Sequence, residues 1–136
     1  MIDLIEQTES IRRRYEQYHR LFQQGELEKA EEVLWSIIVV MLDAISMLVQ
    51  GRPLRRHREL KIFVKTELAQ LYNSLTGGDP VVLVKLFENA ERLHANFYHE
   101  FLDAEELLNY IGAAELLAQI LNELLDMVIK KALGSE

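Results

Sequence analysis

The stretch VLWSIIVVMLDAISMLV, residues 33–49, decides the fold of this chain. Its seventeen residues hold only three polar side chains, Ser36, Asp43 and Ser46. A helix that is apolar nearly all round has to be covered on every side, so the other helices are expected to pack around it. A membrane span needs about 20 apolar residues, and an aspartate is costly at the centre of a bilayer. The pattern therefore predicts the central helix of a soluble bundle, with no membrane association.

Four further helices are expected around this central helix, which is predicted to span about 26–50. Apolar residues at helical spacing predict them over about 3–23, 54–75 and 80–101, and a last one from 103 to a closing glycine at 134. Gly25 and Gly51 suit helix ends, and Asp79-Pro80 and Asp103 suit helix starts. All four connections are short, which makes sequential helices antiparallel. We therefore predict an all-α, antiparallel up-and-down bundle of five helices in a single domain, residues 1–136.

Composition narrows the functional classes. The chain has no cysteine, which excludes disulfides and thiolate metal sites, and Met1 leads into an amphipathic segment rather than a signal peptide. We therefore expect a cytoplasmic protein. The net charge of −7 argues against a broad electrostatic grip on nucleic acid. However, residues 52–65 hold six basic residues against one acid, whereas residues 93–129 hold seven acids and no lysine or arginine. This asymmetry allows a local basic patch on an acidic protein.

Two segments resemble a known family. The segment Ala90-Glu-Arg-Leu-His-Ala-Asn-Phe-Tyr-His99 resembles the AExLHANFY signature of archaeal PaREP-type proteins, which belong to the HEPN (higher eukaryotes and prokaryotes nucleotide-binding) superfamily. The segment Gly25-Glu-Leu-Glu-Lys-Ala-Glu-Glu-Val-Leu-Trp35 is similar to the entry of that family's central helix, and His57 is similar to a histidine near the start of its third helix. The resemblance implies a helical bundle, commonly dimeric, that binds nucleotide or RNA, partners a nucleotidyltransferase or cleaves RNA without a metal.

Arg92 and His99 are the candidate catalytic residues. Cleaving members of the family carry an arginine and a histidine separated by four to six residues, usually with a polar residue directly after the arginine. Arg92 and His99 have that spacing, but Leu93 follows the arginine. Seven residues apart, the two side chains fall on one helix face, opposite the apolar stripe and with Asn96 between them. A cation and an imidazole there can hold a phosphodiester and transfer protons, but the same pattern is ordinary on a solvated helix surface.

The candidate ligand-binding residues lie on the fourth predicted helix and in the basic segment. His94 and Tyr98 flank the apolar stripe, where they can stack on a base or join a buried network. With Asn96 they are expected to contact a ligand in a cleft beside this helix, while Arg55, Arg56 and His57 belong to a basic edge that either grips phosphate or is simply solvated.

Asp43 and two Glu-x-x-His motifs also need an explanation. A carboxylate inside the central helix is seldom left unpaired, so Asp43 is expected to pair with His19, His94, a tyrosine or an arginine. Glu16-x-x-His19 and Glu91-x-x-His94 match the ligand pairs of di-iron bundles. Such a site also needs an inward-facing glutamate from each of two other helices, and the central helix offers only Asp43. We therefore expect no metal and no cofactor.

Together these observations predict a non-catalytic, HEPN-like homodimer that binds nucleotide or RNA. Two other functions stay open. One is a metal-independent, toxin-like endoribonuclease that uses Arg92 and His99. The other is a protein-interaction module that partners a nucleotidyltransferase.

Overall fold

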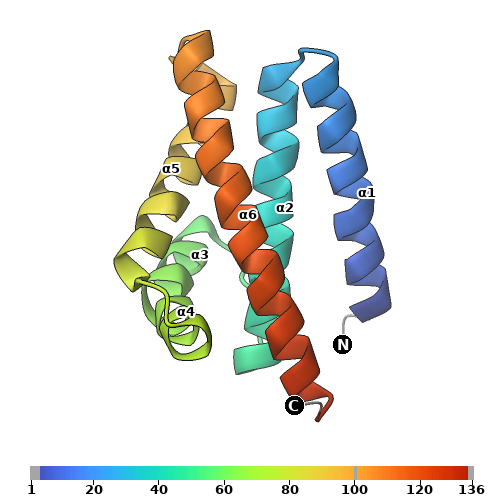
Figure 1. The fold of residues 1–136 in the computed structure, drawn as a ribbon, viewed down its shortest axis with the longest axis vertical. Helices are drawn as coiled ribbons and strands as arrows, with labels where there is room; N and C mark the ends of the chain where they lie inside the picture. Colours follow the sequence, from blue (N-terminus) through green and yellow to red (C-terminus); the bar gives the residue numbers. More distant parts are fainter. Residues whose placement is uncertain (1–3, 100, 135–136) are drawn as a thin grey trace.

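The computed structural model describes residues 4–99 and 101–134, and their side chains except those of Leu4, Tyr98 and His99. Within these ranges the chain is helical between short turns and has no strand, which confirms the predicted all-α class. The helices are α1 (Leu4–Gln23), α2 (Leu27–Gln50), α3 (His57–Phe63), the π-helical turn η1 (Val64–Leu68), α4 (Ala69–Thr76), α5 (Pro80–His99) and α6 (Ala104–Ala132) (Figure 1). Because α3, η1 and α4 follow one another without a break, the described chain forms five helical rods.

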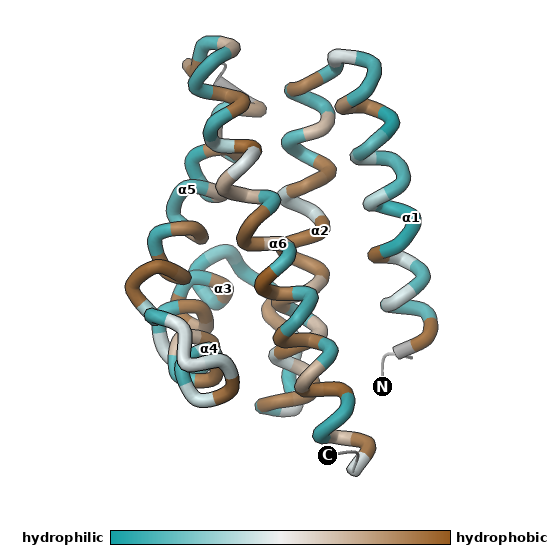
Figure 2. The backbone as a smooth tube through the Cα atoms, in the orientation of Figure 1, coloured by the Kyte–Doolittle hydropathy of each residue, from teal (hydrophilic) through white to brown (hydrophobic). Residues whose placement is uncertain are grey.

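The α2 helix is the centre of the bundle, as the sequence predicts. It packs against α1, α5 and α6, and more lightly against α3. The side chains of Ile37, Ile38, Leu42 and Ile45 are fully buried. Hydrophobic residues concentrate along α2, whereas α1 is mostly hydrophilic (Figure 2). Among the described helices, α2 alone is long and apolar enough to cross a membrane. Half of its most apolar 18-residue stretch is buried inside the bundle.

Most predicted helix boundaries are confirmed, and two need correction. Asp103 caps α6 by accepting a hydrogen bond from the backbone N–H of Glu106 at 2.8 Å. The α6 helix then runs unbroken through Gly112, the one glycine within it. The third rod begins at His57 rather than at residue 54, because residues 51–56 form a loop. The α5 helix ends at His99, so Phe101 lies outside the helix that was predicted to contain it.

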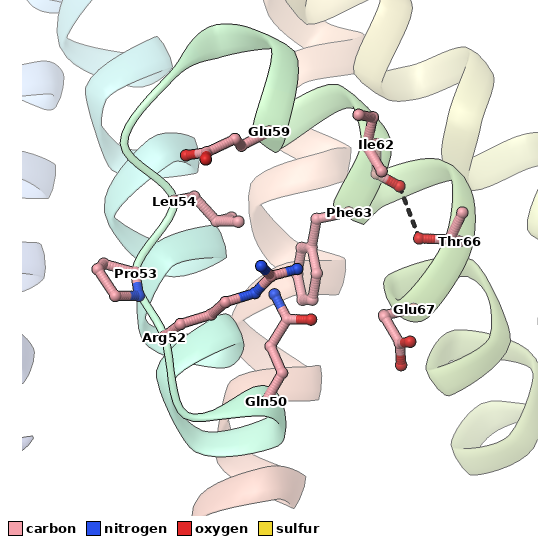
Figure 3. Close-up of a pocket in the computed structure, with 9 residues that line it drawn as sticks. All are labelled: Gln50, Arg52, Pro53, Leu54, Glu59, Ile62, Phe63, Thr66 and Glu67. Atoms are coloured by element: carbon pink, nitrogen blue, oxygen red, sulfur yellow. Dashed lines mark hydrogen bonds between the residues drawn. The ribbon is translucent and has the colours of Figure 1, made fainter.

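The direction of the third rod departs from the predicted up-and-down order. His57, at the start of the rod, lies beside Trp35 in the first half of α2, with ring centroids 5.9 Å apart. Further along the rod, Glu67 lines the same pocket as Gln50, the last residue of α2. The rod therefore runs parallel to α2. Residues 51–56 run back along α2 from its end to the point where the rod begins (Figures 1 and 3). The prediction that a short link makes these two helices antiparallel is wrong.

Two polar side chains of the central helix hold this returning loop. The Asp43 carboxylate accepts a hydrogen bond from the backbone N–H of Leu54 at 2.8 Å. The buried Ser46 hydroxyl donates to the backbone carbonyl of Arg52 at 2.7 Å. The expected pairing of Asp43 with His19, His94, a tyrosine or an arginine is therefore wrong, because the carboxylate serves a backbone N–H group instead. A loop laid on an apolar helix needs such partners for its backbone polar groups.

A π-helical turn interrupts the third rod. In η1 each backbone hydrogen bond spans five residues instead of the four of an α-helix. The Thr66 hydroxyl donates to the carbonyl of Ile62 at 2.7 Å. Single π turns inside α-helices are rare and occur often at functional sites. The sequence pattern predicted a continuous helix here, because an extra residue in one turn hardly disturbs the apolar spacing of its neighbours.

The loop anchor gives the first prediction. Asp43→Ala should lower the free energy of unfolding by about 1–3 kcal/mol, because it leaves the Leu54 N–H without its partner in a half-buried position. Asp43→Asn keeps an oxygen acceptor and should cost less. Chemical denaturation measures both variants, and amide hydrogen exchange should show lost protection at Leu54.

Asp126→Ala is the matched control, since among the described residues the side chain of Asp126 pairs only with Lys130, in an exposed ion pair. Equal losses of stability in Asp43→Ala and Asp126→Ala would show that Asp43 does not anchor the loop.

Candidate functional site

An aromatic and imidazole cluster joins α2, α3 and α5. Its centre is Trp35, which is only 6% exposed. The His94 ring stacks on the indole with centroids 4.8 Å apart and planes at 16°. Phe87 and His57 approach the indole at 5.9 Å each. The two histidines that sequence reasoning proposed as ligand contacts are therefore brought together around one tryptophan, although they lie far apart in the chain.

Each histidine of this cluster is paired with a carboxylate. Nδ1 of His94 lies 2.9 Å from Glu32 of α2, and Nε2 of His57 lies 2.5 Å from Glu91 of α5. Glu91 also pairs with Lys61 at 3.6 Å. These bonds tie α3 and α5 to each other and to α2. In the side chains that the structure describes, no group of three or more His, Asp or Glu residues is arranged to hold a metal ion.

Asn96 is not on the exposed face of α5 where the helical wheel placed it. It is 1% exposed, its amide Nδ2 lies 3.3 Å from both carboxylate oxygens of Glu31, and its Oδ1 accepts from the backbone N–H of Leu102 at 2.8 Å. Asn96 therefore joins α2 to the turn between α5 and α6. Because its amide is already bonded at both ends, it has little to offer a ligand.

Glu31 is a fully buried carboxyl group that accepts hydrogen bonds from the Asn96 amide. Burial raises the pKa of Glu31 to about 7; the nearby Glu28 and Glu32 raise it further, and the Asn96 hydrogen bond opposes both effects. Near neutral pH the protonated and the charged form of this side chain are therefore both populated. Sequence reasoning missed it because glutamates are ordinary in the first turns of a helix.

The proposed catalytic pair is described only in part. The Arg92 guanidinium lies over the ring of Phe101 at 4.8 Å and near that of Tyr110 at 5.8 Å, so it stacks on aromatic rings around the start of α6. The side chains of His99 and of Tyr98, the third proposed ligand contact on α5, lie outside the described residues.

The basic segment is exposed, and its backbone is fixed. The side chains of Arg52, Arg55, Arg56 and Arg58, here named the basic edge, are exposed. The backbone N–H groups of Arg55 and Arg56 both donate to Glu59, at 2.7 and 3.1 Å. These two bonds, with the nearby arginine charges, hold the pKa of Glu59 below its ordinary value. Across the side chains described, none of the four guanidinium groups has a hydrogen bond or an ion pair.

A pocket of about 290 Å³ lies at one end of the basic edge. One wall comes from the end of α2 and the returning loop, and the other comes from α3 and the π turn (Figure 3). The residues that line it are Gln50, Arg52, Pro53, Leu54, Glu59, Ile62, Phe63, Thr66 and Glu67. Sequence reasoning proposed only basic residues of this region and His57 as ligand contacts. It did not predict the pocket, because an antiparallel third helix would have kept Glu67 away from Gln50.

Comparison with protein-family models, with curated proteins and with solved structures finds no match for this chain. The resemblance of residues 90–99 to the HEPN signature therefore stays a prediction, and the functional argument rests on the geometry.

The buried carboxyl group predicts how stability depends on pH. The pKa of Glu31 is about 7 in the folded chain, against an ordinary value of 4.5. The folded state therefore holds the proton more tightly, so this contribution to stability is fully present below pH 4.5 and is lost as the pH rises through 7. The difference of about 2.5 between the two pKa values corresponds to roughly 3 kcal/mol.

Glu31→Gln keeps the shape of the side chain and removes its charge, so it should raise the melting temperature at pH 8 and flatten the loss of stability between pH 5 and 8. Thermal denaturation at several pH values measures this, with the exposed Glu123→Gln as control. An unchanged pH profile in Glu31→Gln would contradict the assignment.

Proposed function

We propose that this protein is a non-catalytic, HEPN-like RNA- or nucleotide-binding protein that holds the phosphates of its ligand on the basic edge. The observation that carries the proposal is four arginines within seven consecutive residues, all exposed and none in an ion pair among the described side chains. Arginine is well suited to phosphate because its planar guanidinium donates two parallel hydrogen bonds. In a chain of net charge −7, such a local excess of positive charge is unusual.

Preorganisation of the loop supports the same proposal. Asp43 and Ser46 hold residues 52 and 54 on α2, and Glu59 holds the backbone of residues 55 and 56. A loop that is already ordered loses less conformational freedom when a ligand binds. Acidic α6 lies elsewhere on the bundle, so its charges repel polyanions and favour an approach to the basic edge.

The ligand contacts are reassigned from α5 toward this edge. Arg55, Arg56 and His57 keep their proposed roles, because all three are exposed on or beside the edge. His94 is stacked on Trp35 and bonded to Glu32, and we propose that it supports His57 and the edge rather than contacting the ligand.

We also propose a homodimer, with a nucleotidyltransferase as an alternative partner of the same surface. What supports a protein partner is the outer side of α6, where Leu108 and Leu116 are nearly half exposed and Gly112 between them leaves open space. Exposed apolar side chains that recur along one helix side are typical of interfaces.

Binding to RNA is tested with the double variant Arg55→Ala/Arg56→Ala. We expect wild type to bind single-stranded RNA at low salt, and we expect the variant to bind at least about tenfold more weakly. Loss of two phosphate contacts should also reduce the slope of log affinity against log salt by roughly 1.4. Fluorescence anisotropy of a labelled oligonucleotide measures both quantities.

Arg13→Ala/Arg20→Ala is the matched control, because both arginines are exposed on α1 and make no described ion pair. An equal loss of affinity in the two double variants would point to net charge alone and would refute the role of the basic edge.

The ribonuclease alternative is tested with the same RNA incubated in EDTA. We expect the RNA to remain intact, because the Arg92 guanidinium is held on aromatic rings. Cleavage that disappears in both Arg92→Ala and His99→Ala would replace the non-catalytic proposal with a metal-independent endoribonuclease. Gel electrophoresis of the RNA is the measurement, and circular dichroism confirms that each variant folds.

A further inference from the structure

The pocket between α2 and the π turn combines apolar and polar side chains. Its apolar lining consists of Pro53, Leu54, Ile62 and Phe63, with the Phe63 side chain 3% exposed. The volume of about 290 Å³ has room for a nucleobase, but the sugar and phosphate of a nucleotide would have to extend beyond it. Arg52 belongs both to the lining and to the basic edge. A nucleotide whose base lies in the pocket would therefore have its phosphate near the arginines of the basic edge.

The polar groups of the pocket are mostly hydrogen-bond acceptors. Gln50 donates one Nε2 proton to Ser46 at 2.8 Å, which leaves its Oε1 as an acceptor and its second Nε2 proton as a neutral donor. The Thr66 hydroxyl donates its proton to the carbonyl of Ile62, so toward a ligand it can act only as an acceptor. The Glu67 carboxylate accepts only, and no hydrogen bond or ion pair ties it to another described side chain. The one cationic donor of the lining is Arg52, which comes from the returning loop on the opposite wall (Figure 3).

This pattern selects among the four bases. Guanine presents three N–H protons, from N1 and N2, along one edge, and two acceptors, O6 and N7, toward another edge. Adenine and cytosine each offer one amino group beside ring acceptors, and uracil offers a single N–H. A pocket with a carboxylate on one wall and an arginine on the other therefore suits guanine best, since arginine pairs with O6 and N7, and a carboxylate accepts from N1–H and the N2 amino group.

We propose that this pocket binds a guanine base, with Glu67 accepting from its N1 and N2 edge and Arg52 donating to O6 and N7. The inference rests on the proposed function, because the phosphates of the same ligand are placed on the basic edge. It also gives the π turn a role, since the turn carries Thr66 and Glu67 along one wall of the pocket.

The test compares three labelled heptanucleotides, UUUUUUU, UUUAUUU and UUUGUUU, by fluorescence anisotropy at one salt concentration. We expect the single guanine to tighten binding roughly 5- to 100-fold over uridine alone, the discrimination that a good bidentate pair provides. Adenine should give little gain. Glu67→Gln should abolish most of the guanine preference while affinity for the all-uridine strand stays the same or rises slightly, because a negative charge has been removed.

Three controls make the outcomes separable. Glu88→Gln removes an exposed carboxylate outside the pocket and should leave the preference unchanged. Arg55→Ala/Arg56→Ala should weaken all three strands equally. Circular dichroism checks the fold of Glu67→Gln, whose parent side chain is exposed.

Equal affinity for the three strands, unaltered in Glu67→Gln, would overturn the guanine assignment while the proposed function stands. No binding of any strand, and no thermal shift with guanosine monophosphate, would overturn both.

Discussion

The hydrogen bond from the Leu54 backbone to the Asp43 carboxylate is the constraint on which the functional surface depends. Together with the bond from Ser46 to the Arg52 carbonyl, it lays residues 51–56 back along α2. An apolar helix of this kind offers a neighbouring loop almost no polar partners, so the two exceptions decide where the loop lies. Two of the three polar side chains in the central stretch, Asp43 and Ser46, therefore direct the chain that follows it.

The parallel course of the third rod follows from that loop. Because the rod starts beside Trp35 and passes the end of α2, it brings His57 into the aromatic cluster and Glu67 to the pocket. The same loop carries three of the four arginines of the basic edge on a fixed backbone, and the fourth, Arg58, follows in the first turn of α3. Fold and candidate site thus share one cause: the segment that orients the rod is also the segment that carries the charge.

Several residues of the segment that resembles the HEPN signature join α5 to other helices of this bundle. Glu91 bonds to His57, His94 to Glu32, and Asn96 to Glu31, so polar contacts from α5 reach α2 and α3 at three levels. A polar pattern along a helix can therefore reflect the need to join helices as well as the need to bind a ligand. Buried polar bonds of this kind favour one packing arrangement over its competitors, since a wrong register leaves them unpaired.

The sequence by itself determined the all-helical class, the central place of α2 and most helix ends, because apolar periodicity, glycines and capping residues act locally. It also determined that the positive charge is concentrated in residues 52–65. Only the tertiary structure decided the direction of the third rod, the burial of Asn96 and Glu31, and the pocket beside the π turn. These features depend on residues distant in the chain. Asp43 bonds to Leu54, and Gln50 lines the same pocket as Glu67, and local patterns do not specify which segments come together.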